Sequence, residues 1–405
     1  MKTLLISEVF PPQVGGSGHW FWEVYRRFPQ DDAVVTAGCS GGWQTFDAGH
    51  TMRVHRLPLA LRQWGVSSPS TSWRYLRLAG RLWRIASQES CDVVHAGRIL
   101  PEGWLAWLLK LTTCRPYLCY VHGEELSYGF DSRQLAWMMR RVLAEANCVV
   151  ANSRNTARLL QKDWKVPDGK VCVLHPGVDT HRFVPERRRN DLRKRLGWGE
   201  RPVILTVGRL QLRKGHDTLI RALPQITQTV PDVLYVIAGE GTARQNLEDL
   251  VRELRVESHV QFLGEINDCQ LLECYQQCDV FALPNRAIGG DIEGFGIVLL
   301  EAQACGKPVV AGDSGGTRET MISGETGLIV DCTHPGSLAQ MLESLLTDVG
   351  RCRRMGQAGR NWVVDRFDWN VLATQAKILF EQRFSANGRN SVLKGPTDSE
   401  TTVVQ

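Results

Sequence analysis

The chain has 405 residues, which is too long for one ordinary hydrophobic core and predicts two domains. Its 43% hydrophobic and 22% charged residues are typical of a globular protein and exclude disordered and fibrous classes. The net charge is only +5, and no apolar run has the length of a signal-peptide core or a membrane span, so we expect a cytoplasmic protein.

Short apolar runs of buried-strand type alternate with amphipathic stretches along the whole chain. In the first half the runs are 3–6, 33–35, 92–94, 117–121 and 148–150. In the second half they are 203–207, 234–237, 260–263, 279–282 and 308–310. Strands that alternate with helices predict parallel sheets covered by helices on both faces. The predicted fold class is α/β, with two doubly wound domains.

The domain boundary is predicted where the chain becomes charged and almost free of apolar residues, at 185–195. We therefore expect an N-terminal domain at 1–185 and a C-terminal domain at 186–366. A helical pattern at 367–384 is expected to pack back towards the N-terminal domain. The polar remainder, 385–405, is predicted to be disordered.

A glycine-rich segment follows the first predicted strand, with Gly15, Gly16 and Gly18 ahead of an aromatic helix. Ligands of open α/β sheets bind beyond the carboxyl ends of the strands, and glycines there let backbone N–H groups approach a phosphate. The segment matches neither a dinucleotide fingerprint nor a P-loop. A simple tight turn is the alternative.

Arginines are concentrated in residues 51–90, which hold a single acid, Glu89. The arginines are Arg53, Arg56, Arg62, Arg74, Arg77, Arg81 and Arg84, and tryptophans 64, 73 and 83 lie among them. A nucleic-acid partner is not expected, because no recognised nucleic-acid module is present. Two interpretations of 62–84 stay open, a solvated helix face and a helix on an anionic membrane with Leu78, Leu82 and Ile85 as its apolar side.

The second predicted domain opens with a strand that leads into Gly-Arg-(x)4-Lys-Gly at 208–215. Arg209 and Lys214 thus lie between the end of a buried strand and the start of a helix, where two cations can clamp a diphosphate. A pair of unconnected surface charges is the alternative.

Two glutamates with seven residues between them lie in the segment 284–306. Glu293 falls in a glycine-rich turn, and Glu301 falls inside the helix that follows. The neighbours of Glu301 are apolar, so its carboxylate is expected to be buried and to need partners. Asp291 and Glu293 superficially resemble a metal-binding pair, but the glycine-rich context and the nearby cations favour a site without metal. The twelve scattered cysteines form no Cys-x-x-Cys pair, and we expect free thiols.

With these motifs the sequence resembles glycosyltransferase family 4, whose members are retaining enzymes with the GT-B fold, two Rossmann-like domains that face each other across a cleft. The resemblance runs from the Gly15–Gly16 segment to the final helix. It implies catalytic roles for His122 and Glu293. It implies donor-binding roles for Gly15, Gly16, Arg209, Lys214, Gly264, Phe295, Gly296, Ile297 and Glu301. Arg209 and Lys214 would bind the diphosphate, and Glu301 the ribose.

The lengthened loop 285–292, with 301–306 and 175–179, is similar to bacterial phosphatidylinositol mannosyltransferases that use GDP-mannose. The resemblance implies a nucleotide-sugar donor, mannose as the transferred hexose and a lipid-linked or glycan acceptor. From the arginine-rich segment 62–84 we expect peripheral association with the cytoplasmic face of the membrane. UDP-glucose, UDP-galactose and UDP-N-acetylglucosamine remain open as donors. No cofactor and no metal are expected.

The resemblance implies that configuration is retained by attack on the same face of the sugar, and a covalent route through a carboxylate stays open. Two other functions are kept as alternatives. One is a GT-B-fold epimerase or phosphorylase, and the other is an inactive carbohydrate-binding relative. Incubation with donor alone separates an epimerase, which converts the donor, from a transferase, which hydrolyses it slowly.

Overall fold

The computed structural model of the protein describes residues 1–13, 15–127, 129 and 132–384, so the predicted tail lies outside the described residues. The first half of the chain forms a seven-stranded parallel sheet in the order β3-β2-β1-β4-β5-β6-β7. Its strands are β1 (Thr3–Ser7), β2 (Ala33–Gly38), β3 (Arg53–Leu57), β4 (Val93–Ala96), β5 (Tyr117–Val121), β6 (Cys148–Ala151) and β7 (Val171–Val173).

The second half forms a six-stranded parallel sheet in the order β10-β9-β8-β11-β12-β13. Its strands are β8 (Val203–Val207), β9 (Leu234–Ala238), β10 (Val260–Gly264), β11 (Val280–Leu283), β12 (Val309–Gly312) and β13 (Leu328–Val330). The central strands of both sheets are buried, apart from half-buried Val207 at the end of β8, which explains why they read as continuous apolar runs.

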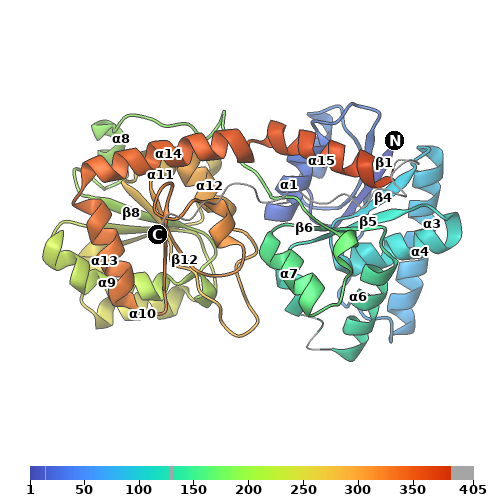
Figure 1. Cartoon of the computed structure of the whole chain (residues 1–405), viewed down its shortest axis with the longest axis horizontal. Helices are drawn as coiled ribbons and strands as arrows, with labels where there is room; N and C mark the ends of the chain where they lie inside the picture. Colours follow the sequence, from blue (N-terminus) through green and yellow to red (C-terminus); the bar gives the residue numbers. More distant parts are fainter. Residues whose placement is uncertain (14, 128, 130–131, 385–405) are drawn as a thin grey trace, which may run out of the picture.

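Helices cover both faces of each sheet, as Figure 1 shows. The helices of the first half are α1 (Gly16–Tyr25), α2 (Trp43–Ala48), α3 (Pro69–Gln88), α4 (Trp104–Thr113), α6 (Arg133–Glu145) and α7 (Arg154–Lys162). The later helices are α8 (Asn190–Arg195), α9 (His216–Thr229), α10 (Arg244–Glu253), α11 (Asp268–Gln277), α12 (Ile297–Ala304), α13 (Pro335–Leu346), α14 (Val349–Phe367) and α15 (Trp369–Phe384).

Each sheet lies between two hydrophobic layers. In the first domain, α3, α4, α6 and α7 pack on one face, and α1 and α15 pack on the other. In the second, α9, α10 and α13 oppose α11, α12 and α14. The predicted fold class, two Rossmann-like α/β domains, is confirmed.

The last helix connects the two halves of the molecule. In Figure 1, α14 lies along the second domain and α15 continues from it to the first. There α15 packs against α1, with Trp369 fully buried. Arg27, two residues after the end of α1, also donates a hydrogen bond from Nε to Asn370 Oδ1 at 2.9 Å. The last described helix of the chain, α15, thus stabilises the N-terminal domain.

The strand order reverses at one point in each sheet, between β1 and β4 and between β8 and β11. In doubly wound sheets the loops that leave the carboxyl ends of strands at such a point diverge and leave room for a ligand. The Gly15–Gly16 segment follows β1, Arg209 follows β8, and the loop with Glu293 follows β11. The candidate residues therefore come from the places where this fold binds ligands.

One expectation about α3 is wrong. Leu78, Leu82 and Ile85 are buried in the core of the first domain, so they are not an apolar side that faces a membrane. The helix turns this side inward because the sheet beside it also needs cover. Its outer surface instead carries Trp73 and Trp83, which are 62% and 48% exposed.

Candidate functional site

The loop after β8 places the two predicted cations in different environments. Arg209 is exposed, and within the described part of the chain it has no carboxylate partner. Lys214 lies in a 3-10 helix (Leu212–Lys214) and is 8% exposed. Its Nζ lies 2.6 Å from Glu293 Oε2. One cation is thus free at the surface, and the other is held by an acid.

Glu293 is the centre of a buried charge cluster. Besides Lys214, the guanidinium of Arg213 contacts its Oε2, at 2.8 Å from Nη1. Burial alone would raise the pKa of Glu293, but the charges of Lys214 and Arg213 outweigh burial and lower it. Glu293 therefore stays ionised at neutral pH.

Arg213 also contacts Asp291, with Nε 3.1 Å from Oδ1. The two acids that resembled a metal-binding pair in the sequence are therefore both paired with this arginine. Arg213 was not predicted from the sequence, because it occupies a variable position of Gly-Arg-(x)4-Lys-Gly. The signal that was present is its place next to Lys214.

Glu301 lies on α12, which begins after the glycine-rich turn. Tyr275 of α11 donates its hydroxyl to Glu301 Oε2 at 2.6 Å. Burial raises the pKa of Glu301, and the hydrogen bond from Tyr275 offsets part of that rise. Leu299 and Leu300 beside it are buried as expected, but Glu301 itself is half-buried, so the expectation of a buried side chain holds only in part.

The turn before α12 brings a backbone N-terminus into the same region. Gly296 has φ +98° and serves as the N-cap of α12, a conformation that favours glycine. Phe295 is buried, and His175 stacks on it with ring centroids 5.2 Å apart. Ile297 follows as the first residue of the helix. The free N–H groups of a helix N-terminus favour an anionic ligand.

The first domain approaches this turn closely. A Cβ atom at Gly294 would lie 2.7 Å from the carbonyl oxygen of His122, so only glycine permits the contact. At Gly16, a Cβ atom would lie 3.7 Å from Ile297 Cδ1. His122 follows β5, is half-buried, and donates from Nε2 to the carbonyl of Gly97 at 2.8 Å. The structure thus brings His122 and Gly16 to the loop of Glu293.

The remaining predicted residues lie at the margins of this region. Gly264 ends β10 with φ +69°, and its carbonyl accepts a hydrogen bond from Gly239, the residue after β9. A Cβ atom at Gly264 would lie 2.9 Å from Glu240 Oε1. Gly15 precedes α1 as its N-cap. Within the described part of the chain, Gly264 makes no hydrogen bond to Arg209 or Lys214.

A polar cluster that the sequence analysis missed lies at the switch point of the first sheet. Arg98, just after β4, contacts Glu8 Oε2 at 2.9 Å and Glu102 at 3.1 Å. The backbone N–H of Glu8 donates to Glu102 Oε1 at 2.8 Å. Gly97, the partner of His122, adjoins Arg98 in the chain. The sequence feature that could have revealed this cluster is the position of Glu8 just after β1 and of Arg98 just after β4.

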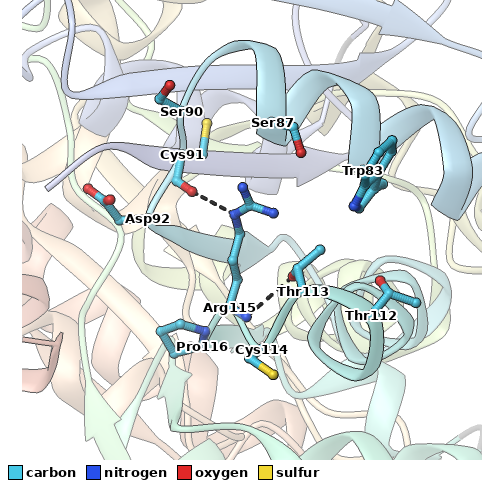
Figure 2. Close-up of a pocket in the computed structure, with 10 residues that line it drawn as sticks. All are labelled: Trp83, Ser87, Ser90, Cys91, Asp92, Thr112, Thr113, Cys114, Arg115 and Pro116. Carbon is cyan, nitrogen blue, oxygen red and sulfur yellow. Dashed lines mark hydrogen bonds between the residues drawn. The ribbon is translucent and has the colours of Figure 1, made fainter.

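A hollow of about 650 Å³ lies elsewhere, beside the residues that precede β4 and β5. It is therefore at the amino ends of these strands, opposite the loops described above. Figure 2 shows Arg115 within it, donating from Nε to the carbonyl of Cys91 at 2.8 Å and from its backbone to Thr113 at 3.3 Å. The lining offers no base paired with a nucleophile, and we assign it no role.

The arrangement suits binding of a diphosphate whose negative charge grows during a reaction. Arg209, Lys214 and the N-terminus of α12 provide positive potential, and Glu293 and Glu301 provide acceptors for hydroxyl groups. Among the described residues, no cluster of three or more histidines, cysteines or acids is suited to hold a metal ion.

Two family models match the chain. The model described as Glycosyltransferase Family 4 matches residues 14–182, and the model described as Glycosyl transferases group 1 matches residues 188–362. The two matches fall on the first and second sheets respectively.

Two curated relatives match over nearly their whole length. The GDP-mannose-dependent alpha-(1-6)-phosphatidylinositol monomannoside mannosyltransferase of Mycolicibacterium smegmatis is 34% identical over 391 residues, which cover 95% of this chain and 99% of the relative. The GDP-mannose-dependent monoacylated alpha-(1-6)-phosphatidylinositol monomannoside mannosyltransferase of Corynebacterium glutamicum is 31% identical over 389 residues, which cover 94% and 98%.

A solved structure shares the fold. Anabaena Alr3699/HepE in complex with UDP and glucose matches with a TM-score of 0.78 at 22% identity, covering 94% of this chain and 99% of that one. At this identity the match supports the two-domain architecture.

Proposed function

The chain belongs to glycosyltransferase family 4, and we propose that it transfers mannose from GDP-mannose to a hydroxyl of a phosphatidylinositol-mannoside type of glycolipid. It is a hexosyltransferase of the GT-B type. The observation that supports the donor and acceptor best is the 34% identity, over 95% of the chain, with an enzyme of that specificity.

In the proposed donor complex, Arg209 and Lys214 bind the diphosphate. Arg209 is free to do so, since it has no carboxylate partner in the described part of the chain. Glu301 accepts hydrogen bonds from the ribose, and the Gly264 region lies beside the base. Glu293 and the backbone of Phe295 to Ile297 hold the sugar, with His122 and the Gly15–Gly16 segment on its other side.

Departure of the nucleoside diphosphate leaves an oxocarbenium-like sugar and increases the negative charge on the leaving group. The two cations and the α12 N-terminus stabilise that charge because they are already oriented when the reaction begins. A metal ion is then unnecessary, since Asp291 and Glu293 are both occupied by Arg213. The acceptor hydroxyl attacks from the same face of the sugar and gives its proton to the departing phosphate.

We place the acceptor on the first domain, where α3 presents a surface suited to a membrane. Arg74, Arg77, Arg81 and Arg84 recur at helical spacing, α3 contains no acid, and none of these arginines has an acidic partner among the described residues. Exposed Trp73, Leu76 and Trp83 form a parallel stripe. Among the described residues, no helix combines the length and the apolar character needed to cross a membrane.

The proposal is tested by a donor screen followed by an acceptor assay. GDP-mannose and GDP should raise the melting temperature, since a ligand at a hundred times its Kd stabilises by about 2.7 kcal/mol, whereas UDP-sugars should not. GDP-mannose alone should be hydrolysed slowly, and added phosphatidylinositol mannoside should increase turnover and yield a mannosylated lipid. A rise in melting temperature with UDP-glucose and not with GDP-mannose would overturn the assignment of GDP-mannose as donor. Full conversion of the donor without acceptor would indicate an epimerase.

A further inference from the structure

Arg213 is a buried arginine in a loop where an exposed one would be expected. It is 5% exposed, although it lies in a short 3-10 helix at the end of the β8 loop. Its guanidinium contacts Glu293 and Asp291, and its carbonyl accepts a hydrogen bond from the backbone N–H of Arg286 at 2.8 Å. Both its side chain and its backbone therefore hold the loop that carries Glu293.

Arg213 and Lys214 compete for one oxygen. Their nitrogens lie 2.8 and 2.6 Å from Glu293 Oε2. Because Arg213 is also paired with Asp291, the two cations and the two acids balance in charge, and a diphosphate that draws one cation away leaves a carboxylate with one partner fewer. Only one of the two can follow the phosphate without releasing another acid, because Arg213 is also bound to Asp291.

Lys214 is the cation placed to move. Its Cε and Nζ would lie 3.8 and 4.0 Å from a Cβ atom at Gly208, the residue that precedes Arg209 in the predicted clamp. Its flexible stem carries a single point charge, whereas the planar guanidinium of Arg213 is fixed by two acids. When Lys214 turns to the diphosphate, Glu293 would be a buried carboxylate that depends on Arg213 alone.

Resting on the proposed function, we propose that Arg213 is a positioning residue that keeps Glu293 ionised and oriented towards the transferred sugar while Lys214 is engaged by the diphosphate. Arg213 does not itself touch the donor. Its contact with Asp291 anchors it independently of Lys214. The two neighbouring cations therefore have separate tasks, one on the leaving group and one on the carboxylate.

The separate roles of Arg213 and Lys214 predict a change in the pH dependence of kcat when Arg213 is replaced. Burial raises the pKa of Glu293, and Lys214 and Arg213 together lower it. If Arg213 is removed, Lys214 alone must serve both the carboxylate and the diphosphate. Burial then prevails in the donor complex, and the pKa of Glu293 rises. The acid limb of the kcat profile should therefore move to higher pH.

The test compares Arg213→Gln with Arg213→Lys and with the control Arg221→Gln, which removes an exposed arginine from α9. GDP affinity is measured by calorimetry, and kcat for GDP-mannose hydrolysis and for transfer is measured across pH. We expect Arg213→Gln to bind GDP within about threefold of wild type, to lose up to about a hundredfold in kcat, and to show the shifted acid limb. Arg213→Lys should restore part of kcat and of the acid limb, and Arg221→Gln should match wild type.

Three results would overturn the assignment. A loss of GDP affinity in step with kcat would make Arg213 a ligand of the diphosphate. An unshifted acid limb would reduce it to a structural contact, and an unchanged kcat would leave it without a role. If Arg213→Gln does not fold, Arg213→Lys applies the same criteria, because a lysine cannot contact both acids as the guanidinium does. Failure of the wild type itself to bind GDP or hydrolyse GDP-mannose would instead refute the proposed function.

Discussion

Glu319 Oε2, in the second domain, lies 2.9 Å from Nε2 of His175, which belongs to the segment that links the domains. The same carboxylate accepts the backbone N–H groups of Arg154 at 2.7 Å and Asn155 at 3.0 Å, at the N-terminus of α7 in the first domain. His175 in turn stacks on Phe295, two residues after Glu293 in the same turn. The Glu319 side chain thus links the second domain to the first and, through His175, to the turn that precedes α12.

Replacing Glu319 with glutamine should weaken this junction. Burial would raise the pKa of Glu319, but the hydrogen bonds from His175 and the two backbone groups lower it. The folded-state pKa is depressed, so the stabilisation is present above the unfolded pKa and is lost as the pH falls through the folded pKa. We expect Glu319→Gln to cost about 1 kcal/mol at neutral pH, the size of a lost helix cap, and less in acid.

Urea denaturation of wild type and Glu319→Gln over a series of pH values measures this difference. Glu325→Gln, an exposed site in the same domain, is the matched control. A difference between wild type and Glu319→Gln that stayed constant into the acid range would show that the charge of Glu319 is not what stabilises the junction.

The diphosphate clamp makes a second prediction. Arg209→Ala and Lys214→Ala should each lower kcat/KM by roughly a hundredfold, the range for removing one group that stabilises developing charge. Because Arg209 is exposed and unpaired among the described residues, its substitution should leave the melting temperature unchanged. Steady-state kinetics and thermal denaturation measure the two effects, and near-wild-type kinetics in both variants would refute the donor site.

Glu301 should recognise the ribose. Its carboxylate is oriented by the Tyr275 hydroxyl, and we expect Glu301→Ala to weaken GDP binding by about 2 kcal/mol, a typical value for a hydrogen bond to a charged group. The variant should lose this energy for GDP and not for analogues that lack the ribose hydroxyl it contacts. Calorimetry with GDP, 2′-deoxy-GDP and 3′-deoxy-GDP tests the assignment. An equal loss of binding free energy for all three nucleotides would show that Glu301 does not contact the ribose hydroxyls.

The central strands could be predicted from sequence because both of their faces are buried, which leaves a continuous apolar run. The strands that were missed, β3, β7 and β13, all lie at sheet edges. There β3 keeps exposed and half-buried polar residues such as Arg53 and His55, and β7 and β13 are only three residues long. Edge strands bury less surface, so their apolar signal is weaker.

The candidate site could be predicted only where a motif marks it. Arg209, Lys214, Glu293 and Glu301 stand at recognisable spacings. The role of Arg213 depends on acids 78 and 80 positions later in the chain, a separation over which sequence pattern carries no information about contact. The inner face of α3 was likewise misassigned, because periodicity shows which residues share a face and not what covers it.

Metal independence makes a further prediction. Activity with GDP-mannose should survive excess EDTA, because cationic side chains neutralise the diphosphate and because Arg213 occupies Asp291 and Glu293. Mannosyl transfer is measured before and after chelation, with EDTA carried through a no-enzyme control. Loss of activity that magnesium or manganese restores would show that these acids bind metal in the donor complex.

The surface of α3 makes the last prediction. Its four arginines, Arg74, Arg77, Arg81 and Arg84, each contribute about 1 kcal/mol near an anionic lipid surface, an attraction that salt weakens. Trp73 and Trp83, exposed beside them, are suited to the interface between headgroups and acyl chains. We therefore expect the protein to co-sediment with vesicles that contain anionic lipids, and to do so less as salt is raised.

Replacing the four α3 arginines with serine should abolish this binding while GDP affinity stays unchanged, because the helix lies on the outer face of the first domain. A control variant removes the same charge from exposed positions of the second domain, namely Arg221, Arg353, Arg354 and Arg366. If net charge alone governed binding, the two variants would lose it equally. Retention by the control and loss by the α3 variant would locate the contact on α3. Negligible binding by the wild type would show that α3 is a solvated face and would favour an acceptor that is not membrane-bound.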